Sequence, residues 1–153
     1  MVDFNPPVTK FDIYLIDTNI LRKIFEGDVT VLSHVRRVRQ DRIGVSIIAV
    51  AEVTKGWTDI IAQSHSKEAI VQKIYDRFYS DTQKLWSNTV VPYSLAAAEC
   101  FGDLDSTIGA KDRRIAATAL TYGYKLVTAN RRHFVKLMPE EDIVDWTLDP
   151  TLD

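Results

Sequence analysis

The stretch YLIDTNIL, residues 14–21, sets the expected architecture of this chain. It begins as a short apolar run that predicts a buried strand ending at Asp17, and the residues from Asn19 onward predict a helix. The same succession recurs along the sequence, with further strands expected at 43–46, 89–91, 125–128 and 143–146. Short strands that alternate with helices predict an α/β fold with a central, largely parallel sheet of four to five strands flanked by helices.

The clearest helical pattern lies between the second and third expected strands. There Ile70, Ile74, Phe78 and Leu85 recur at three-to-four-residue spacing or its multiple, which predicts an amphipathic helix over 66–86. Other helices are expected at 19–25, after Asp28, from 47 to about Gly56, at 95–104 after a Ser94 cap, at 112–121 before Gly123, and as a turn at 130–134.

Three acidic residues, Asp17, Glu52 and Asp112, fall where the apolar patterns leave little room for a charge. A carboxylate in apolar surroundings is costly unless it is paired or bound to a metal. Asp17 directly follows the first strand, Glu52 lies on the helix after the second, and Asn130 comes just after the fourth. Because ligands of parallel α/β sheets bind beyond the carboxyl ends of the strands, these residues could converge at one edge of the sheet.

The predicted cluster indicates a particular chemistry. Carboxylates together with an amide oxygen form a hard-oxygen site that suits Mg²⁺ or Mn²⁺ rather than zinc. Such ions neutralise phosphodiester charge, activate a water molecule and stabilise the leaving oxygen. The arrangement therefore favours magnesium- or manganese-dependent phosphodiester hydrolysis.

Each residue of the cluster also has a structural alternative. Asp17 or Asn19 could simply cap the helix that follows. Asp112 suits a first helical turn through the helix dipole, and Asn130 is an ordinary turn residue. The combination favours a functional site more strongly than any single member does.

Composition limits the possible functions. The 153 residues fit a single domain, expected over residues 12–148 behind an N-terminal arm at 1–11. A net charge of −2 means that any nucleic-acid contact must come from local basic clusters. The single Cys100 excludes an intramolecular disulfide and a cysteine-based zinc site. With neither a secretory signal nor a long apolar run, we expect a cytoplasmic protein with no membrane association.

Two small basic clusters flank the predicted site. Arg113 follows the third acid, and Arg131, Arg132 and His133 follow Asn130. The three arginines are candidates for binding RNA phosphates, and the alternative is a solvated helix face. The histidines of the chain show no metal-ligand spacing, so we expect packing or surface roles for them.

At these residues the chain resembles the PIN-domain nucleases and, within them, the VapC-type toxins of bacterial toxin–antitoxin pairs. The matching segments occur in the family's order over roughly residues 12–146. They are LIDTNIL at 15–21, VSIIAVAEVTKGW at 45–57, KDRRIAATAL at 111–120 and KLVTANRRHF at 125–134.

The resemblance implies a PIN-like three-layer fold and a divalent-metal ribonuclease. It carries the catalytic and metal-binding roles onto Asp17, Glu52 and Asp112. Asn130 falls at a fourth catalytic position, where family members have Asp or Asn. Neighbouring polar positions that orient such a site correspond to Thr18, Asn19 and Thr128.

The segment KDRR, residues 111–114, departs from the family pattern, because an apolar residue commonly follows the acid. The resemblance also implies an RNA substrate, a homodimer and a cognate antitoxin protein that inhibits the toxin.

Two other functions remain open at the level of sequence. A noncatalytic PIN-like module for RNA binding or protein interaction would keep the fold, although it would not need buried carboxylates. A phosphatase with an aspartate nucleophile is disfavoured, because DTN at 17–19 lacks the second Asp expected two positions after the nucleophile.

Overall fold

The structure is a computed structural model that describes residues 12–149, so the expected N-terminal arm at 1–11 lies outside the described residues. The strands are β1 (Tyr14–Ile16), β2 (Ile43–Ser46), β3 (Thr89–Val91), β4 (Lys125–Val127) and β5 (Ile143–Val144). The helices are α1 (Thr18–Glu26), α2 (Val29–Arg37), α3 (Ile47–Ala62), α4 (Glu68–Trp86), α5 (Leu95–Gly102), α6 (Ala110–Tyr122) and α7 (Arg131–Phe134). Short 3-10 turns, η1 (Gln40–Arg42) and η2 (Glu140–Asp142), precede β2 and β5.

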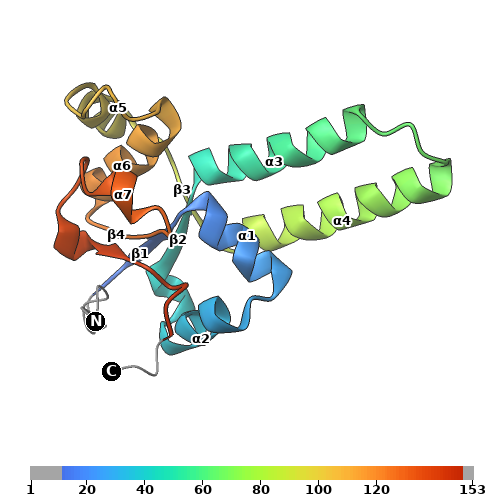
Figure 1. Ribbon diagram of the computed structural model, residues 1–153, viewed down its shortest axis with the longest axis horizontal. Coiled ribbons are helices and arrows are strands. Elements are labelled where there is room, and N and C mark those ends of the chain that lie inside the picture. Colours follow the sequence, from blue (N-terminus) through green and yellow to red (C-terminus); the bar gives the residue numbers. More distant parts are fainter. Residues whose placement is uncertain (1–11, 150–153) are drawn as a thin grey trace.

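The five strands form one sheet in the order β3-β2-β1-β4-β5, and every neighbouring pair is parallel. The first strand lies at the centre, where Leu15 is in register with Gly44 on one side and Leu126 on the other. The chain first builds the sheet outward from β1 through β2 to β3, and then crosses to the other side of β1 for β4 and β5 (Figure 1). The predicted α/β fold with a parallel sheet is confirmed.

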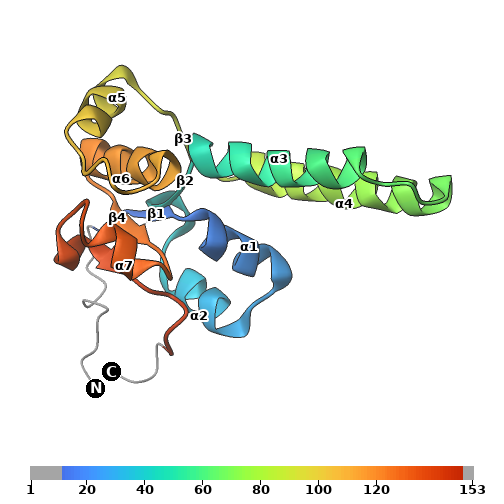
Figure 2. The same cartoon turned by 45° about the horizontal axis from the view of Figure 1, so that its top comes forward.

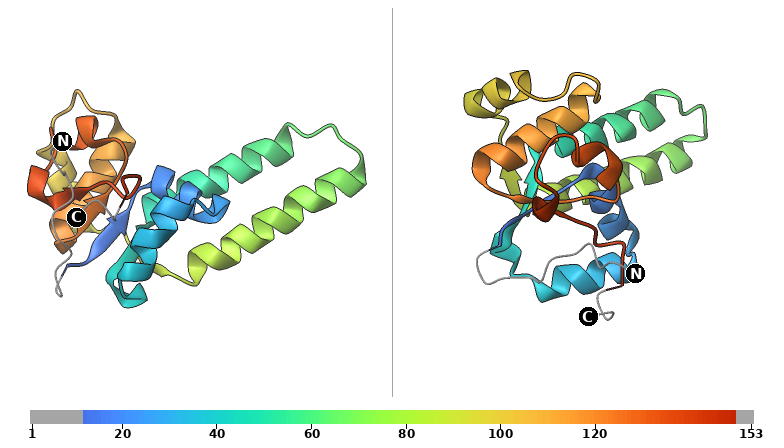
Figure 3. Two further views of the ribbon diagram at one scale, coloured as in Figure 1. Left: turned by 60° about the horizontal axis from the view of Figure 1, so that its bottom comes forward. Right: turned by 60° about the vertical axis from the view of Figure 1, so that its left-hand side comes forward.

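Helices cover both faces of the sheet and give three layers (Figure 3). Because successive strand residues point to opposite faces, Tyr14 and Ile16 pack into one core with α1, α2 and the start of α3. Leu15 lies in a second core, where it packs with Ile115 of α6 and Phe134 of α7. The central strand is therefore buried from both sides, as its uninterrupted apolar sequence predicts.

Helices α3 and α4 form a hairpin that extends away from the sheet (Figure 2). The prediction that the third helix ends near Gly56 is wrong, because α3 continues to Ala62. Just beyond Gly56, Trp57 stacks on Phe78 of α4 at 6.2 Å between ring centroids, and its indole N–H donates to Asp81 Oδ2 at 3.1 Å. This packing outweighs the cost of about 1 kcal/mol for a glycine inside a helix.

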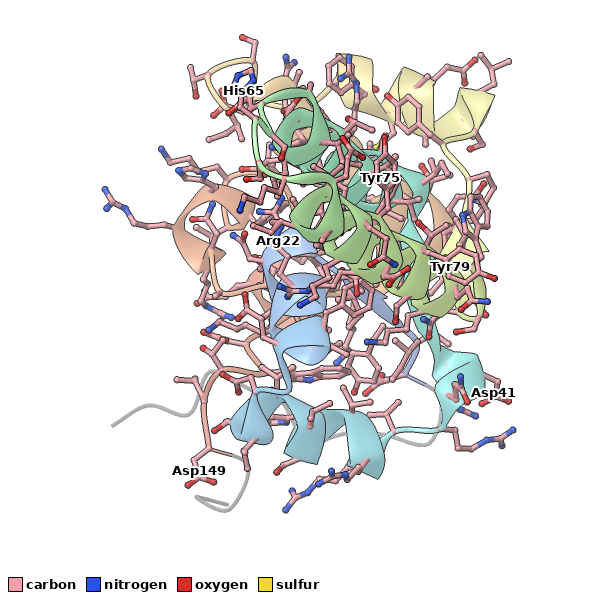
Figure 4. All side chains as sticks on the ribbon, turned by 90° about the vertical axis from the view of Figure 1, so that its right-hand side faces the viewer. Arg22, Asp41, His65, Tyr75, Tyr79 and Asp149 are labelled. Carbon is pink, nitrogen blue, oxygen red and sulfur yellow. The ribbon has the colours of Figure 1, made fainter. Side chains whose placement is uncertain are left out.

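Much of the hairpin surface is open to solvent. Figure 4 views the molecule from the hairpin side and shows His65 near the turn between the two helices, with Tyr75 and Tyr79 on α4. Both tyrosines are exposed, and Leu85 near the base of α4 is fully buried. Among residues 12–149, no helix combines the length and the apolar character needed to cross a membrane.

Candidate active site

Asp17 lies where the central strand passes into α1. Its backbone N–H donates to Val127 O of β4 at 2.9 Å, which ties the residue to the carboxyl end of the sheet. Its carboxylate accepts from the Thr18 N–H at 2.7 Å and from the Thr128 hydroxyl at 2.8 Å. Asp17 is thus the N-cap of α1, as the structural alternative predicted, and its carboxylate also belongs to a polar cluster at the sheet edge.

The electrostatics of Asp17 depend on residues from two other elements. The residue is only 5% exposed, and this burial is the main reason that its pKa is raised above the ordinary value. The hydrogen bonds from Thr128 and Thr18 lower the pKa in part. The negative charge of Asp112 raises it further, and the positive charge of Lys111 lowers it. Asp17 is therefore within electrostatic range of the start of α6.

Glu52 reaches the same region from α3. The strand β2 runs directly into this helix, and Ser46 caps it by accepting from the Ile48 N–H at 3.0 Å. The Glu52 side chain is 15% exposed, and its Oε1 atom lies against the Lys111 ammonium. Because this oxygen accepts no hydrogen bond of ordinary geometry from residues 12–149, the contact is an ion pair.

Asp112 lies in the first turn of α6, next to Lys111. Its Oδ2 atom is 3.1 Å from His133 Nδ1, and the same ring nitrogen is 2.8 Å from Asn130 Nδ2. When protonated, Nδ1 donates to Asp112, and when unprotonated it accepts from the Asn130 amide. The Asn130 backbone N–H donates to Thr128 Oγ1 at 3.0 Å, so Asn130 is connected to Asp17 through Thr128.

The remaining predicted residues take different positions. Thr18 is buried, and its hydroxyl has no hydrogen-bond partner within the described part of the chain. Asn19 is exposed on the first turn of α1. Thr128 is fully buried and donates to Asp17.

The three predicted phosphate-binding arginines also differ in their surroundings. The Arg113 guanidinium lies 4.3 Å from the centre of the Phe101 ring. The Arg131 guanidinium donates to Ile143 O at 2.9 Å and forms an ion pair with Glu140, so it joins α7 to the last strand and the turn before it. Arg132 is exposed on α7.

Two residues of this cluster, Lys111 and His133, were not assigned to the site from the sequence. Lys111 pairs with Glu52, and His133 contacts Asp112 and Asn130. The only sequence signals were the position of Lys111 directly before an acid and the three-residue spacing from Asn130 to His133.

The chemistry of the donor atoms fits a divalent cation. Asp17 and Asp112 interact electrostatically, and a cation, the Lys111 ammonium, already lies against Glu52. As the side chains stand, residues 12–149 contain no group of three or more Asp, Glu, His or Cys side chains placed to hold one metal ion. A divalent cation bound by Glu52 would take the place that the Lys111 ammonium occupies beside Oε1, and carboxylate oxygens are ligands that such ions prefer.

A separate pocket of about 360 Å³ lies between α1 and the α3–α4 hairpin. Its lining includes Arg22, Phe25, Trp57 and Arg77, and none of the three clustered acids contributes to it. The pocket and the polar cluster are therefore different features of the surface.

Comparison with known proteins places this geometry in a family. Over residues 14–137 the sequence matches the PIN domain. Among solved structures, a toxin–antitoxin complex from Klebsiella pneumoniae contains a similar chain, with a TM-score of 0.66 and 22% identity over 86% of this chain and 95% of the other. VapBC2 from Rickettsia felis, solved with a DNA fragment from its promoter, gives a TM-score of 0.60 and 24% identity over 88% and 98% of the two chains.

A third similar structure, VapBC-1 from nontypeable Haemophilus influenzae, gives a TM-score of 0.64 and 22% identity over 89% and 99% of the two chains. No curated protein matches. The structural likenesses show the same fold, and the match over most of the chain shows that this protein belongs to the PIN domain family.

Proposed function

We propose that this protein is a divalent-metal-dependent endoribonuclease that cleaves RNA phosphodiester bonds. The observation that carries the proposal is that Lys111 pairs with Glu52 and acts electrostatically on Asp17, as Asp112 also does, at the carboxyl end of a parallel sheet in a chain of the PIN domain family. A buried carboxylate such as that of Asp17 is costly to keep, and a binding module would have no use for it.

In this proposal Asp17, Glu52 and Asp112 hold Mg²⁺ or Mn²⁺, and Asn130 is a fourth catalytic residue that acts beside them. The bound ion would supply charge neutralisation for the phosphodiester and a water of lowered pKa. Thr128 fixes the Asp17 carboxylate through its hydrogen bond of 2.8 Å. Thr18 and Asn19 form the first turn of α1, which starts directly at the site.

Arginines beside the acids are proposed to bind the RNA phosphates. Arg132 is the most available of the three candidates, because Arg131 is engaged with Ile143 and Glu140. Arg113 would have to leave the Phe101 ring or bind RNA from that position. We therefore expect the loss of Arg132 to weaken RNA binding without changing metal affinity.

We also propose that the protein is the toxin of a toxin–antitoxin pair, which is inhibited by a cognate antitoxin and acts as a cytoplasmic homodimer. The support comes from similar chains in solved structures described as toxin–antitoxin complexes. Exposed apolar side chains on the hairpin, such as Tyr79 and Trp86, offer surface for such contacts.

The test is an RNA cleavage assay with purified protein freed of any copurified partner. Total cellular RNA is incubated with Mg²⁺ or Mn²⁺, with and without EDTA, beside Asp17→Asn and Asp112→Asn. The matched control is Asp59→Asn, an exposed aspartate paired with Lys55 on α3. We expect discrete products that disappear with EDTA and in both site variants, and that persist in the control.

Equal metal-dependent cleavage by Asp17→Asn and Asp112→Asn would refute the assigned site. Tight RNA binding that is indifferent to EDTA, without cleavage by any folded form of the protein, would instead identify a noncatalytic RNA-binding module.

A further inference from the structure

Lys111 connects two helices that carry acids of the site. It lies in the first turn of α6, directly before Asp112, and its ammonium forms an ion pair with Glu52 of α3. The same positive charge acts on Asp17 at the end of the central strand. One lysine thus interacts with acids from two other elements of the fold.

The two side chains of this ion pair differ in their exposure to solvent. The Glu52 side chain is 15% exposed, whereas the Lys111 side chain is 60% exposed. A lysine ammonium is strongly hydrated and sits on a flexible stem, so Lys111 can move into water at little cost. Glu52 cannot follow it, and without a cation its charge would be left in a largely dehydrated position.

We propose that Lys111 is an internal counter-ion of the acidic site, which neutralises Glu52 in the metal-free protein and is displaced when a divalent cation binds. The inference rests on the proposed metal-dependent function and adds a competitor that is part of the chain itself. It accounts for the pairing of the largely shielded Glu52 carboxylate with the exposed Lys111 side chain.

Charge arithmetic gives the direction of the effect. Three ionised carboxylates carry −3, and Lys111 reduces the local charge to −2. Replacing Lys111 with Met removes a repulsive charge and frees Glu52, so a divalent cation should bind more tightly. A unit charge close to the site acts strongly on a bound cation, although solvent screens the charge of the exposed Lys111 side chain in part. We therefore expect the dissociation constant for the divalent cation to be about tenfold lower in Lys111→Met.

The experiment is a calorimetric titration of the full chain with Mn²⁺ alone, for the unchanged protein, Lys111→Met and Lys111→Arg. Lys111→Arg keeps the positive charge and should bind Mn²⁺ with nearly unchanged affinity. The matched control is Lys55→Met, which removes a different ion pair, with Asp59, from the exposed surface of α3 and should also leave the affinity unchanged.

A second measurement is thermal unfolding in EDTA. Lys111→Met should melt at a lower temperature than the unchanged protein, because Glu52 loses its counter-ion, and excess Mn²⁺ should abolish this difference. Lys111→Met with unchanged or weaker Mn²⁺ affinity would overturn the inference while leaving the proposed nuclease intact. If Mn²⁺ binds none of the proteins and RNA is not cleaved, the metal-dependent function fails, and the inference fails with it.

Discussion

Asp17 is held at the junction of β1 and α1 with its carboxylate almost entirely shielded from water. Burial raises its pKa, so the folded protein binds a proton at this position more readily than the unfolded chain does. The stability that this difference contributes is fully present below the ordinary pKa of aspartate and is lost as the pH rises through the raised value. At neutral pH the ionised carboxylate therefore opposes folding unless a cation neutralises it.

We therefore predict that Asp17→Asn stabilises the metal-free protein at pH 7, by about 1 kcal/mol. An asparagine can still accept from the Thr18 N–H while it removes the desolvated charge. The measurement is urea unfolding in EDTA at pH 7 and again near pH 3, below the ordinary pKa of aspartate, where the difference should shrink because the carboxyl group is then largely protonated in both states. Asp59→Asn serves as an exposed control, and a destabilised Asp17→Asn at pH 7 would contradict the prediction.

The individual acids could be found from the sequence because each interrupts an apolar pattern, as Glu52 does within residues 45–53. The partners of these acids could not be found from the sequence. Lys111 reaches Glu52 across two helices, and His133 reaches Asp112 from α7. Such contacts depend on how the elements pack and on which rotamers the long side chains adopt, and neither is encoded in local spacing.

At the scale of elements, β2 leads directly into α3, the helix that carries Glu52. Gly44 in β2 allows the side chains of Val91 and Tyr124 to pack closely against this strand. A Cβ atom at this position would lie 2.8 Å from Val91 Cγ2 and 3.3 Å from the Tyr124 ring. Val91 is itself buried on β3, so it has little room to move. The glycine is required here for close packing of β2 against its surroundings.

We predict that Gly44→Ala destabilises the protein by about 1–3 kcal/mol, because the added methyl group overpacks the core. The matched control is Gly102→Ala at the end of α5, where nothing lies within 4 Å of the added atom. Chemical unfolding measures the free energy of unfolding of both variants. Equal stability of Gly44→Ala and the unchanged protein would show that β3 can move aside.

The α3–α4 hairpin depends on Trp57, which stacks on Phe78, donates to Asp81 and lies under the Arg77 guanidinium at 5.8 Å. We predict that Trp57→Ala destabilises the protein by about 3 kcal/mol. Hydrogen exchange should show that amide protection falls more in the distal half of the hairpin than in β1 and β4. Trp57→Phe keeps an aromatic ring at this position and should retain most of the amide protection. A uniform loss of protection over the sheet would contradict this local role.

The elements themselves were largely predictable. Apolar runs located the strands to within a residue or two, and Ser94 and Gly123 marked a helix start and a helix end as expected. The continuation of α3 past Gly56 was not predictable, because it depends on Trp57 meeting α4. The strand order was also hidden, since the crossover that places β4 beside β1 has no local signature.

At the scale of the whole molecule, the acidic site joins elements that belong to different layers. Asp17 comes from the central strand, Glu52 from α3, and Asp112 from α6 on the other face of the sheet. A cation held by all three would link both layers, and a ligand that binds only the folded state stabilises the entire fold.

We predict that Mn²⁺ raises the thermal unfolding temperature of the protein, with a gain of about 2.7 kcal/mol when free Mn²⁺ is a hundredfold above its dissociation constant. Asp17→Asn and Glu52→Gln should lose most of this gain, because each removes a proposed ligand. Asp59→Asn should keep it, because its carboxylate pairs with Lys55 on the surface. Thermal melts of the four proteins, each with Mn²⁺ and with EDTA, make the comparison. A full Mn²⁺ gain in Asp17→Asn would mean that the stabilising ion binds away from the end of β1. A cation in the proposed site would bind more weakly once its most buried carboxylate is removed.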